Sequence, residues 1–303
     1  MRILITGANG QVGRELTESA RRWGFPYIAC DRARLDIGDS VALEAFFAQQ
    51  SFDIVINAAA YTAVDAAEAD SGNAYLVNRD AVQYLALACR RAAVPLLHLS
   101  TDYVFDGANK TAYRETDATH PLSVYGKSKL AGEQALSEIL PTHLILRTAW
   151  VYSPHGRNFV KTMLRLMQVR DEIGVVSDQW GCPTSARSIA EALMKIVAHI
   201  DAAKPFAWGV YHFSGQGRTN WYEFAKEIQR QAGDLLPLHA KITAISTAEY
   251  PTAAVRPANA QLACDKLTSA FDIDLADWRE ELRTMMPTIV HQFEREMPPQ
   301  AGR

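Results

Sequence analysis

The sequence predicts an α/β fold: a doubly wound parallel sheet with a smaller interleaved α/β lobe. In the first half of the chain, short apolar runs alternate with stretches of helical periodicity. Runs of this length that are apolar throughout are typical of strands buried on both faces of a parallel sheet. After Trp150 the alternation becomes irregular. The alternation therefore predicts the sheet, and its loss predicts the second lobe.

The elements of the first half can be assigned in order from this pattern. The predicted strands are Arg2–Thr6, Pro26–Cys30, Ile54–Asn57, Pro95–Ser100 and His143–Thr148. The predicted helices between them are Gln11–Trp23, Ser40–Gln49 with Ser40 as N-cap, Asn78–Ala92 and Gly126–Leu140. Strand and helix thus alternate as a doubly wound sheet requires.

Beyond Trp150 the elements are less regular. Helices are predicted at Asn158–Arg170 and Ala186–Ile200, and Gly209–Ser214 is predicted to be one more core strand. The segments around them are rich in turn residues and proline. We therefore expect residues 1–150, rejoined by about 186–214, to form the sheet domain. Residues 151–185 and 215–303 are expected to form the smaller lobe.

Composition excludes several classes of protein. The formal net charge is −3 at pH 7 and no basic stripe is present, which argues against a nucleic-acid partner. The N-terminal apolar run is too short for a signal peptide or a membrane span. The four cysteines lie far apart without a CxxC pair, which favours free thiols in a reducing compartment. We expect a cytoplasmic protein without a membrane partner.

A glycine-rich turn joins the first strand to the first helix. Its glycines have the spacing that allows a tight turn, close approach of a phosphate, and close packing of helix on strand. The helix N-terminus then offers N–H donors and the positive end of its dipole to that phosphate. The turn therefore predicts a dinucleotide-binding site in residues 1–150. The residues expected to form it are Gly7, Asn9, Gly10, Gln11, Val12 and Gly13.

The end of the second predicted strand gives conflicting signals about the cofactor. Asp31 stands where an acid binds the ribose 2′-hydroxyl and disfavours a 2′-phosphate. Arg32 and Arg34 follow at once and are suited to bind that phosphate. Asp31 taken alone is also typical of a turn. We expect the use of either NADPH or NADH without a strong preference.

Tyr125 and Lys129 stand four residues apart at the start of a predicted helix, and so on one face of it. Ketone reduction needs a proton for the developing alkoxide, and a phenol supplies it when a nearby cation stabilises the phenolate. The pair therefore predicts a proton donor and its cation. A second Tyr-x-x-x-Lys copy, Tyr222 and Lys226, lies beyond the sheet, and we interpret it as packing.

Thr101 directly follows the strand Pro95–Ser100. In open α/β sheets, ligands bind at the carboxyl ends of the strands. A hydroxyl at this edge is suited to hydrogen-bond a substrate carbonyl and stabilise its oxyanion. Thr101 and Asp102 alone are equally typical of a capping turn, but combined with the tyrosine, the lysine and the glycine turn they predict a catalytic site.

These motifs resemble those of the extended short-chain dehydrogenase/reductase family, whose members have a Rossmann domain. The stretches that carry the resemblance are the glycine turn, Asn57-Ala58-Ala59-Ala60, Ser100-Thr101-Asp102-Tyr103-Val104-Phe105 and Tyr125-Gly126-Lys127-Ser128-Lys129. Further similar stretches are Tyr61–Asp65, Arg147–Tyr152, Asp178–Gly181 and Arg256-Pro257. Together they extend over nearly the whole chain.

The resemblance implies NAD(P)H-dependent reduction of the 4-keto group of a dTDP-linked deoxysugar, dTDP-4-dehydro-L-rhamnose. It implies that Thr101, Tyr125 and Lys129 are catalytic, with Asn78 at a fourth catalytic position. Cofactor contacts are implied for the glycine turn, Asp31, Arg32, Asp36, Ile37, Asn57, Ala58, Ala59, Ala60, Tyr125 and Lys129. Substrate contacts are implied for Thr62, Val64, Asp65, Thr101, Asp102, Tyr103, Trp150, Asn158, Gln179, Trp180 and Arg256.

One feature departs from the family. Some members form a dimer bridged by magnesium through glutamates, and Glu15 matches the first of these positions. Arg187 replaces the second acid, and a guanidinium is no ligand for a hard cation. We expect no bridging metal, and a monomer or a metal-free homodimer.

Two alternatives remain open. The first is a nucleotide-sugar epimerase or dehydratase, although dehydratases of this superfamily place a glutamate where this chain has Tyr103. The second is a non-catalytic, dinucleotide-binding regulatory subunit, against which the intact set of Thr101, Tyr125 and Lys129 argues.

Overall fold

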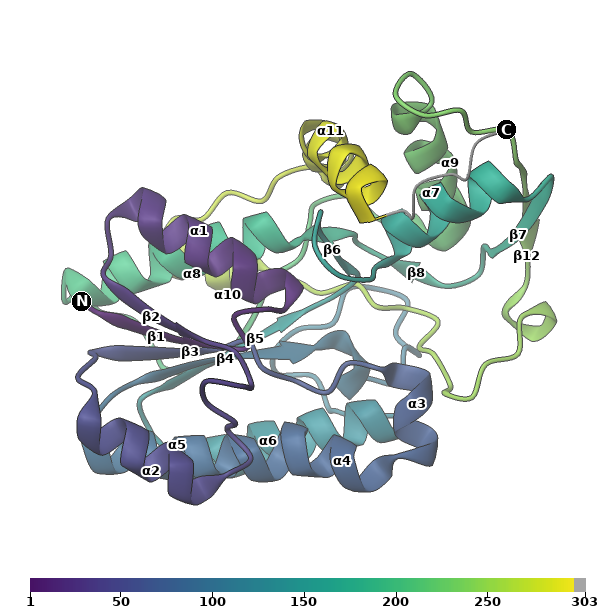
Figure 1. The fold of residues 1–303 in the computed structure, drawn as a ribbon. Helices are drawn as coiled ribbons and strands as arrows, with labels where there is room; N and C mark the ends of the chain where they lie inside the picture. Colours follow the sequence, from purple (N-terminus) through teal and green to yellow (C-terminus); the bar gives the residue numbers. More distant parts are fainter. Residues whose placement is uncertain (297–303) are drawn as a thin grey trace.

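Six parallel strands form the central sheet in the computed structural model, which describes residues 1–296 (Figure 1). The strand order is β10-β5-β4-β3-β1-β2. The strands are β1 (Ile3–Thr6), β2 (Tyr27–Cys30), β3 (Ile54–Asn57), β4 (Leu96–Thr101), β5 (His143–Thr148) and β10 (Gly209–His212). The predicted α/β fold with a doubly wound parallel sheet is confirmed.

Helices cover both faces of this sheet (Figure 1). On one face lie α1 (Gln11–Trp23), α8 (Ala186–Asp201) and α10 (Asp265–Phe271), and on the other lie α2 (Ser40–Gln49), α5 (Ala81–Ala92) and α6 (Val124–Ile139). Successive residues of a strand point to opposite faces, so Ile3 and Ile5 join one core while Leu4 joins the other. Burial on both sides explains why the strands are apolar at most positions.

The strand order reverses beside β1. The chain runs from β1 outward to β2, then returns to place β3 on the other side of β1. The loops that leave β1 and β3 therefore diverge to opposite faces of the sheet. Ligands of doubly wound sheets bind in the crevice that this divergence opens.

The cap of one helix and the starts of two others differ from the sequence prediction. Helix α2 is capped by Asp39, whose carboxylate accepts from the N–H groups of Val41 and Ala42, so the assignment of Ser40 as N-cap was wrong. Aspartate and serine are about equally good caps, and Asp39 is the one that precedes the helix by one residue. Helix α6 begins two residues earlier than predicted, because Ser123 accepts from the N–H of Gly126. Tyr125 therefore lies in its first turn.

The predicted helix Asn78–Ala92 also starts earlier. Helices α3 (Val64–Ala69) and α4 (Ser71–Tyr75) precede it, and a π-helical turn, η1 (Leu76–Asp80), joins α4 to α5. Asn78 lies inside this turn. Single π-helical turns are frequent at functional sites, because they displace one side chain from the regular helix face.

The second lobe packs around its own core. This core contains residues of α7 (Phe159–Val169), β7 (Glu172–Val176), α9 (Trp221–Ala232) and α11 (Trp278–Glu296). Strand β7 pairs in parallel with β12 (Lys241–Ile245). Helix α10 instead packs against the core of the sheet domain, and the exact division of the chain into two lobes stays a prediction. Among residues 1–296, no helix has both the length and the apolar character needed to cross a bilayer.

Candidate active site

A cavity of about 580 Å³ lies at the carboxyl ends of β1, β4 and β5. This volume is in the range that encloses a cofactor or substrate. The predicted residues that line it are Asn9, Gly10, Gln11, Val12, Ala58, Ala60, Thr62, Val64, Thr101, Asp102, Tyr103, Tyr125, Lys129 and Trp150. The sheet topology thus gathers side chains from five separate stretches of sequence at one place.

A second cavity, of about 310 Å³, continues this one toward β2. The two cavities share Asn9, Gly10, Ala58 and Ala60. The second is further lined by the predicted cofactor residues Gly7, Asp31, Arg32, Asp36, Ile37 and Ala59. Together the cavities form a groove that crosses the end of β1, with the glycine turn at its centre.

The glycine turn fits a dinucleotide in its geometry. Gly7 has φ +69°, and a Cβ there would lie 2.5 Å from the backbone nitrogen of Ala59. A Cβ on Gly13 would lie 2.1 Å from the carbonyl oxygen of Gly7, so that only glycine allows α1 to pack this closely. The cap of α1 is Gly10, which has no side chain to compete for the first N–H groups. The cradle is thus shaped by backbone and suits a pyrophosphate.

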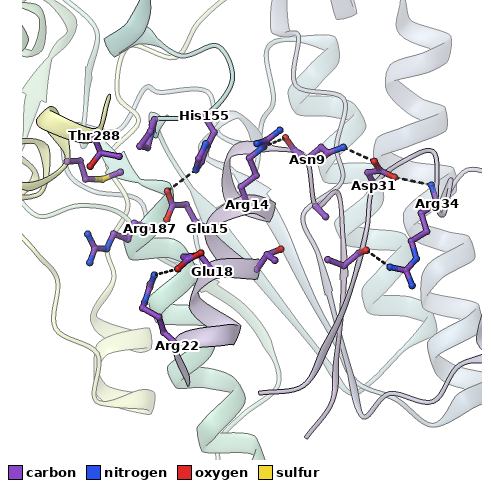
Figure 2. A pocket seen from close by; sticks show the side chains of 15 residues that line it. Asn9, Arg14, Glu15, Glu18, Arg22, Asp31, Arg34, His155, Arg187 and Thr288 are labelled. Atoms are coloured by element: carbon purple, nitrogen blue, oxygen red, sulfur yellow. Dashed lines mark hydrogen bonds and ion pairs between the residues drawn. The ribbon is translucent and has the colours of Figure 1, made fainter. Parts of the chain in front are cut away.

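Asp31 lies at the edge of the groove between two donors (Figure 2). Its Oδ2 accepts from Asn9 Nδ2 at 2.7 Å, and its Oδ1 accepts from the backbone N–H of Arg34 at 3.0 Å. Arg32 pairs with Asp36 at 3.0 Å. The acid is therefore fixed at the end of β2, while both arginines lie exposed beside it.

Thr101 and Asp102 form a buried pair at the end of β4. The Thr101 hydroxyl donates to Asp102 Oδ1 at 3.0 Å and accepts from the N–H of Tyr103 at 3.2 Å. Among the described residues, Asp102 Oδ2 has no hydrogen-bond partner. Burial raises the pKa of Asp102 to about 7. The pair therefore places a hydroxyl and a buried carboxylate oxygen without a partner at the wall of a cavity that both residues line.

Tyr125 reaches the same cavity from the first turn of α6. Its ring is 8% exposed and packs edge-on against Tyr103, with ring centroids 5.4 Å apart. Burial raises the pKa of Tyr125 to about 12, and the nearby Thr101 side chain acts in the opposite direction. A phenol in this environment stays protonated near neutral pH and is available as a donor.

Lys129 is 1% exposed, one turn further along α6. Its Nζ donates to the carbonyl of Leu99 at 2.8 Å and lies 3.2 Å from His98 Nε2. Burial lowers the pKa of Lys129 to about 8, opposed by the charge of Glu133. Sequence reasoning missed His98, although an isolated histidine inside an apolar strand was a visible signal.

Trp150 forms one wall of the cavity and is held in an uncommon conformation. Its φ is +50°, which is strained for a bulky side chain. Trp221, the first residue of α9, stacks on it with ring centroids 3.5 Å apart. A Cβ on Gly181 would lie 2.5 Å from the Trp150 ring, so glycine makes room for it. The sequence analysis assigned no role to Trp221, but the residue that it packs against lines the cavity.

The cavity residues that the sequence analysis did not assign to the site include Thr148 and Arg157. Thr148, at the end of β5, has a buried Oγ1 with no partner among the described residues. Arg157 lines the outer part of the cavity from the turn before α7. Thr148 closes an apolar run and Arg157 lies in a polar turn, so neither differs in sequence from an ordinary strand end or loop.

The predicted residues Asn57 and Asn78 lie beneath the groove. Both are 0% exposed. Asn57 Oδ1 accepts from the N–H of Ala59 at 3.0 Å, and so shapes the loop after β3. Asn78 accepts from the N–H of Tyr61 at 2.9 Å and donates to Ser128 at 3.0 Å, which ties η1 to α6. Both side chains position the backbone that lines the groove.

The remaining predicted substrate residues lie outside the residues that line the cavity and are engaged by other parts of the protein. Arg256 forms a two-pronged pair with Asp65, with contacts of 3.1 and 2.6 Å. Asn158 caps α7 and donates to Gln11 at 3.0 Å. Gln179 donates to Thr247, and the ring of Trp180 is covered by Arg218 at 4.1 Å. Their assignment to the substrate stays a prediction.

A third pocket opens on the other side of the glycine turn, between α1 and α11 (Figure 2). Glu15 lies there 3.6 Å from His155, and Arg187 of α8 lines the same pocket. Burial raises the pKa of Glu15, and the charge of Arg187 opposes this shift. In the described part of the chain, no group of three or more His, Cys, Asp or Glu side chains is arranged to hold a metal ion.

Comparisons with known proteins agree over nearly the full length. A family model described as the RmlD substrate binding domain matches residues 1–290. A dTDP-4-dehydrorhamnose reductase of Sinorhizobium fredii is 45% identical over 287 residues, which are 94% of this chain and 97% of that protein. A solved dTDP-4-dehydrorhamnose reductase of Clostridium acetobutylicum superposes with a TM-score of 0.88 at 38% identity, with 95% and 99% of the two chains covered. One from Bacillus anthracis, in complex with NADP, gives 0.88 at 34% identity, with 94% and 98% covered.

Proposed function

Because the chain belongs to the family described by the RmlD substrate binding domain, we propose that it is a dTDP-4-dehydrorhamnose reductase. It reduces the 4-keto group of dTDP-4-dehydro-L-rhamnose to dTDP-L-rhamnose, with NADPH or NADH as the cofactor. The cofactor lies in the groove across β1, and the sugar lies against Trp150 and Asp102.

The observation that carries this proposal is the convergence of three side chains on one cavity. Thr101 comes from the end of β4, and Tyr125 and Lys129 come from the start of α6. The glycine turn borders the same cavity through Gly10. A hydroxyl, a phenol and an amine beside a dinucleotide cradle are the groups that carbonyl reduction requires.

The side chains act on the carbonyl as follows. When bound, a reduced nicotinamide would supply the hydride for the reduction. The Tyr125 phenol donates its proton to the carbonyl oxygen, which becomes the hydroxyl of the product. Thr101 turns its hydroxyl from Asp102 to the same oxygen and stabilises the charge that develops there. Lys129 stabilises the Tyr125 phenolate until a proton restores the phenol.

The sugar is held by an apolar face and a polar edge. The Trp150 ring, fixed by Trp221, presents a flat surface to the C–H groups of a deoxysugar. Asp102, which lines the cavity, accepts a hydrogen bond from a sugar hydroxyl. Arg157 lies at the outer part of the cavity and is a further candidate for the diphosphate, beside Arg256.

We extend the proposal to the surroundings of the enzyme. The four cysteines are buried and free, which fits a cytoplasmic enzyme. Arg187 beside Glu15 fits a monomer or a metal-free homodimer. Residues 1–150 with about 186–214 bind the dinucleotide, and residues 151–185 and 215–303 complete the sugar-nucleotide site. The partner is the small-molecule substrate, without nucleic acid.

A spectrophotometric assay tests the function. The purified protein is mixed with NADPH or NADH and dTDP-4-dehydro-L-rhamnose, and the loss of absorbance at the reduced nicotinamide is followed. We expect oxidation with both cofactors and formation of dTDP-L-rhamnose. An epimerase would instead retain its nucleotide through purification, and a regulatory subunit would bind NADPH without turnover. Either of these results would overturn the proposal.

A further inference from the structure

A chain of buried hydrogen bonds runs from the cofactor loop to Lys129. The N–H of Ala59 donates to Asn57 Oδ1 at 3.0 Å. Asn57 Nδ2 lies 3.0 Å from His98 Nδ1, and His98 Nε2 lies 3.2 Å from Lys129 Nζ. The side chains of Asn57, His98 and Lys129 are 0%, 1% and 1% exposed. Water therefore has little access to this chain, and its donors and acceptors must match each other.

The proton positions follow from the fixed end of this chain. A backbone N–H can only donate, so Ala59 assigns Asn57 Oδ1 as an acceptor. The hydroxyl of Thr6 donates to the same oxygen at 2.7 Å. Asn57 therefore turns its NH₂ group toward His98, and His98 Nδ1 accepts. A neutral imidazole with an accepting Nδ1 carries its proton on Nε2, which faces Lys129.

The form of Lys129 decides whether this last contact is favourable. An ammonium group only donates, so it would place one donor against the Nε2–H of His98. Turning the Asn57 amide over reverses the histidine but sets the NH₂ group against the N–H of Ala59. When Lys129 is an ammonium, the chain has a donor at each end: the N–H of Ala59 and the Nζ of Lys129. In either orientation of the Asn57 amide, one contact then sets two donors against each other. An unprotonated amine accepts from Nε2–H, and every contact is then satisfied.

We propose that His98 is a positioning residue for the reduction, an inference that rests on the proposed function of Lys129. Its Nε2–H holds the Lys129 side chain against β4 and favours the amine over the ammonium form. Lys129 is thereby able to release a proton within the site, which a fully stabilised ammonium would not do. The Asn57 side chain, held by the cofactor loop, sets the histidine in the orientation that this requires.

The charged and titratable neighbours support this direction. Burial lowers the pKa of Lys129 to about 8, and Glu133, one turn along α6, acts in the opposite direction. Glu133 is itself paired with Arg147 of β5 at 2.6 Å. The pKa of His98 is held well below its usual value by burial, and the charges of Lys129 and of His143 on β5 add to this. His98 therefore stays neutral, as the hydrogen-bond chain requires.

Nitrogen NMR of the full-length protein tests the tautomer directly. The imidazoles are labelled with ¹⁵N, and the His98 signals are assigned as those lost in His98→Gln or shifted in Lys129→Met. We expect a neutral ring with its proton on Nε2 throughout pH 6–9. A proton on Nδ1, or a charged ring in this range, would overturn the inference. This measurement needs no substrate and no activity.

The pH dependence of kcat/KM tests the effect on Lys129. In the native protein, we expect kcat/KM to fall on the alkaline side as Lys129 loses its charge, near pH 8. His98→Leu removes the donor that favours the amine, so the alkaline limb of the kcat/KM profile is expected to shift to higher pH by roughly one unit. His98→Gln keeps an acceptor toward Asn57 and a donor toward Lys129, and it restores the native position.

A matched control separates this effect from general damage. His143 is also buried, but it contacts Leu140 and Ser137 in place of Lys129. His143→Gln is expected to leave the alkaline limb where it is. If His98→Leu lowers stability and activity without moving the limb, His98 has only a structural role and the inference is wrong. If the native protein oxidises no NADPH at all, the proposed function fails, and the tautomer measurement still judges the hydrogen-bond chain.

Discussion

The chain contains the same Tyr-x-x-x-Lys spacing twice, in helices with very different surroundings. Tyr125 and Lys129, at the start of α6, are 8% and 1% exposed and line the main cavity. Tyr222 and Lys226, at the start of α9, lie on the second lobe, where the Lys226 side chain is 50% exposed and pairs with Glu223 at 3.6 Å. In each helix the two side chains share one face.

The difference between the copies lies in what each helix packs against. Helix α6 packs against β4 and β5, which supply His98, Leu99 and Arg147 around Lys129 and Glu133. Helix α9 packs against α7 and α11 and leaves its lysine in solvent. Burial lowers the pKa of Lys129 to about 8, whereas the exposed pair is screened by water. The motif has chemical meaning only where the sheet withdraws it from solvent.

The largest expected effect comes from removing the buried phenol. Tyr125→Phe deletes the proposed proton donor and is expected to lower kcat by about 10²- to 10⁴-fold with cofactor affinity retained. NADPH oxidation at saturating sugar nucleotide gives kcat, and NADPH fluorescence gives the affinity. The matched variant Tyr222→Phe should turn over as the native protein does. If Tyr125→Phe keeps its activity, the two copies do not differ in the way proposed.

The next effect concerns the acid one turn beyond the lysine. Glu133 and Arg147 are 3% and 4% exposed and form a buried ion pair. Glu133→Gln leaves the guanidinium without its counter-charge, so the free energy of unfolding is expected to fall by about 3–5 kcal/mol. Urea denaturation measures this change. Glu223→Gln breaks the exposed pair beside Tyr222, and an equal loss there would contradict the role assigned to burial.

Removal of the buried cation has a smaller effect on the rate. Lys129→Met is expected to lower kcat/KM by about 10²-fold, because the phenolate loses the charge that stabilises it. The rate of the native enzyme should also fall above pH 8, as Lys129 deprotonates. Lys226→Met should leave both the rate and its pH profile unchanged. A similar loss in both lysine variants would remove the distinction between the copies.

The smallest expected effect is a pH-dependent change in stability at Asp102. Burial raises its pKa to about 7 in the folded protein, from 3.8 in the unfolded chain. Between these values the folded state binds more protons than the unfolded state, so stability falls as pH rises through this window. Asp102→Asn removes the penalty and is expected to raise Tm at pH 8 relative to the native protein.

The pH dependence itself provides the control for this prediction. At pH 4 the Asp102 carboxyl is protonated and resembles the amide, so the variant and the native protein should melt at the same temperature. Thermal melts at pH 4, 6 and 8 would show the difference opening as pH rises. A constant difference at all three values would assign the effect to packing instead of charge.

The main features of the fold were predictable because they depend on local patterns. An apolar run such as Ile54–Asn57 needs no partner information to be recognised as a buried strand. The glycine turn and the Tyr125/Lys129 spacing are likewise local. Thr101 ends one strand, and Tyr125 lies at the start of the helix that follows it. Because ligands of parallel sheets bind at the carboxyl ends of the strands, both residues were expected near that edge.

The features that were missed depend on contacts between distant parts of the chain. His98 gains its partner Asn57 from 41 residues away, and Trp221 reaches Trp150 from a later helix, α9. Arg256 meets Asp65 across 191 residues, which local sequence does not predict. The cap of α2 was assigned one residue late for a smaller reason, since Asp39 and Ser40 are both good caps and only geometry separates them.

The sequence alone determined which groups this protein can use: a phenol, an amine, a hydroxyl and a turn without side chains. Only the tertiary structure decided that Lys129 is buried while Lys226 stays exposed to solvent, and that His98 faces Lys129. The physical reason is that burial and hydrogen-bond partners arise from packing between elements. Residue types are carried by the chain, whereas the proton affinity of a side chain is set by what surrounds it.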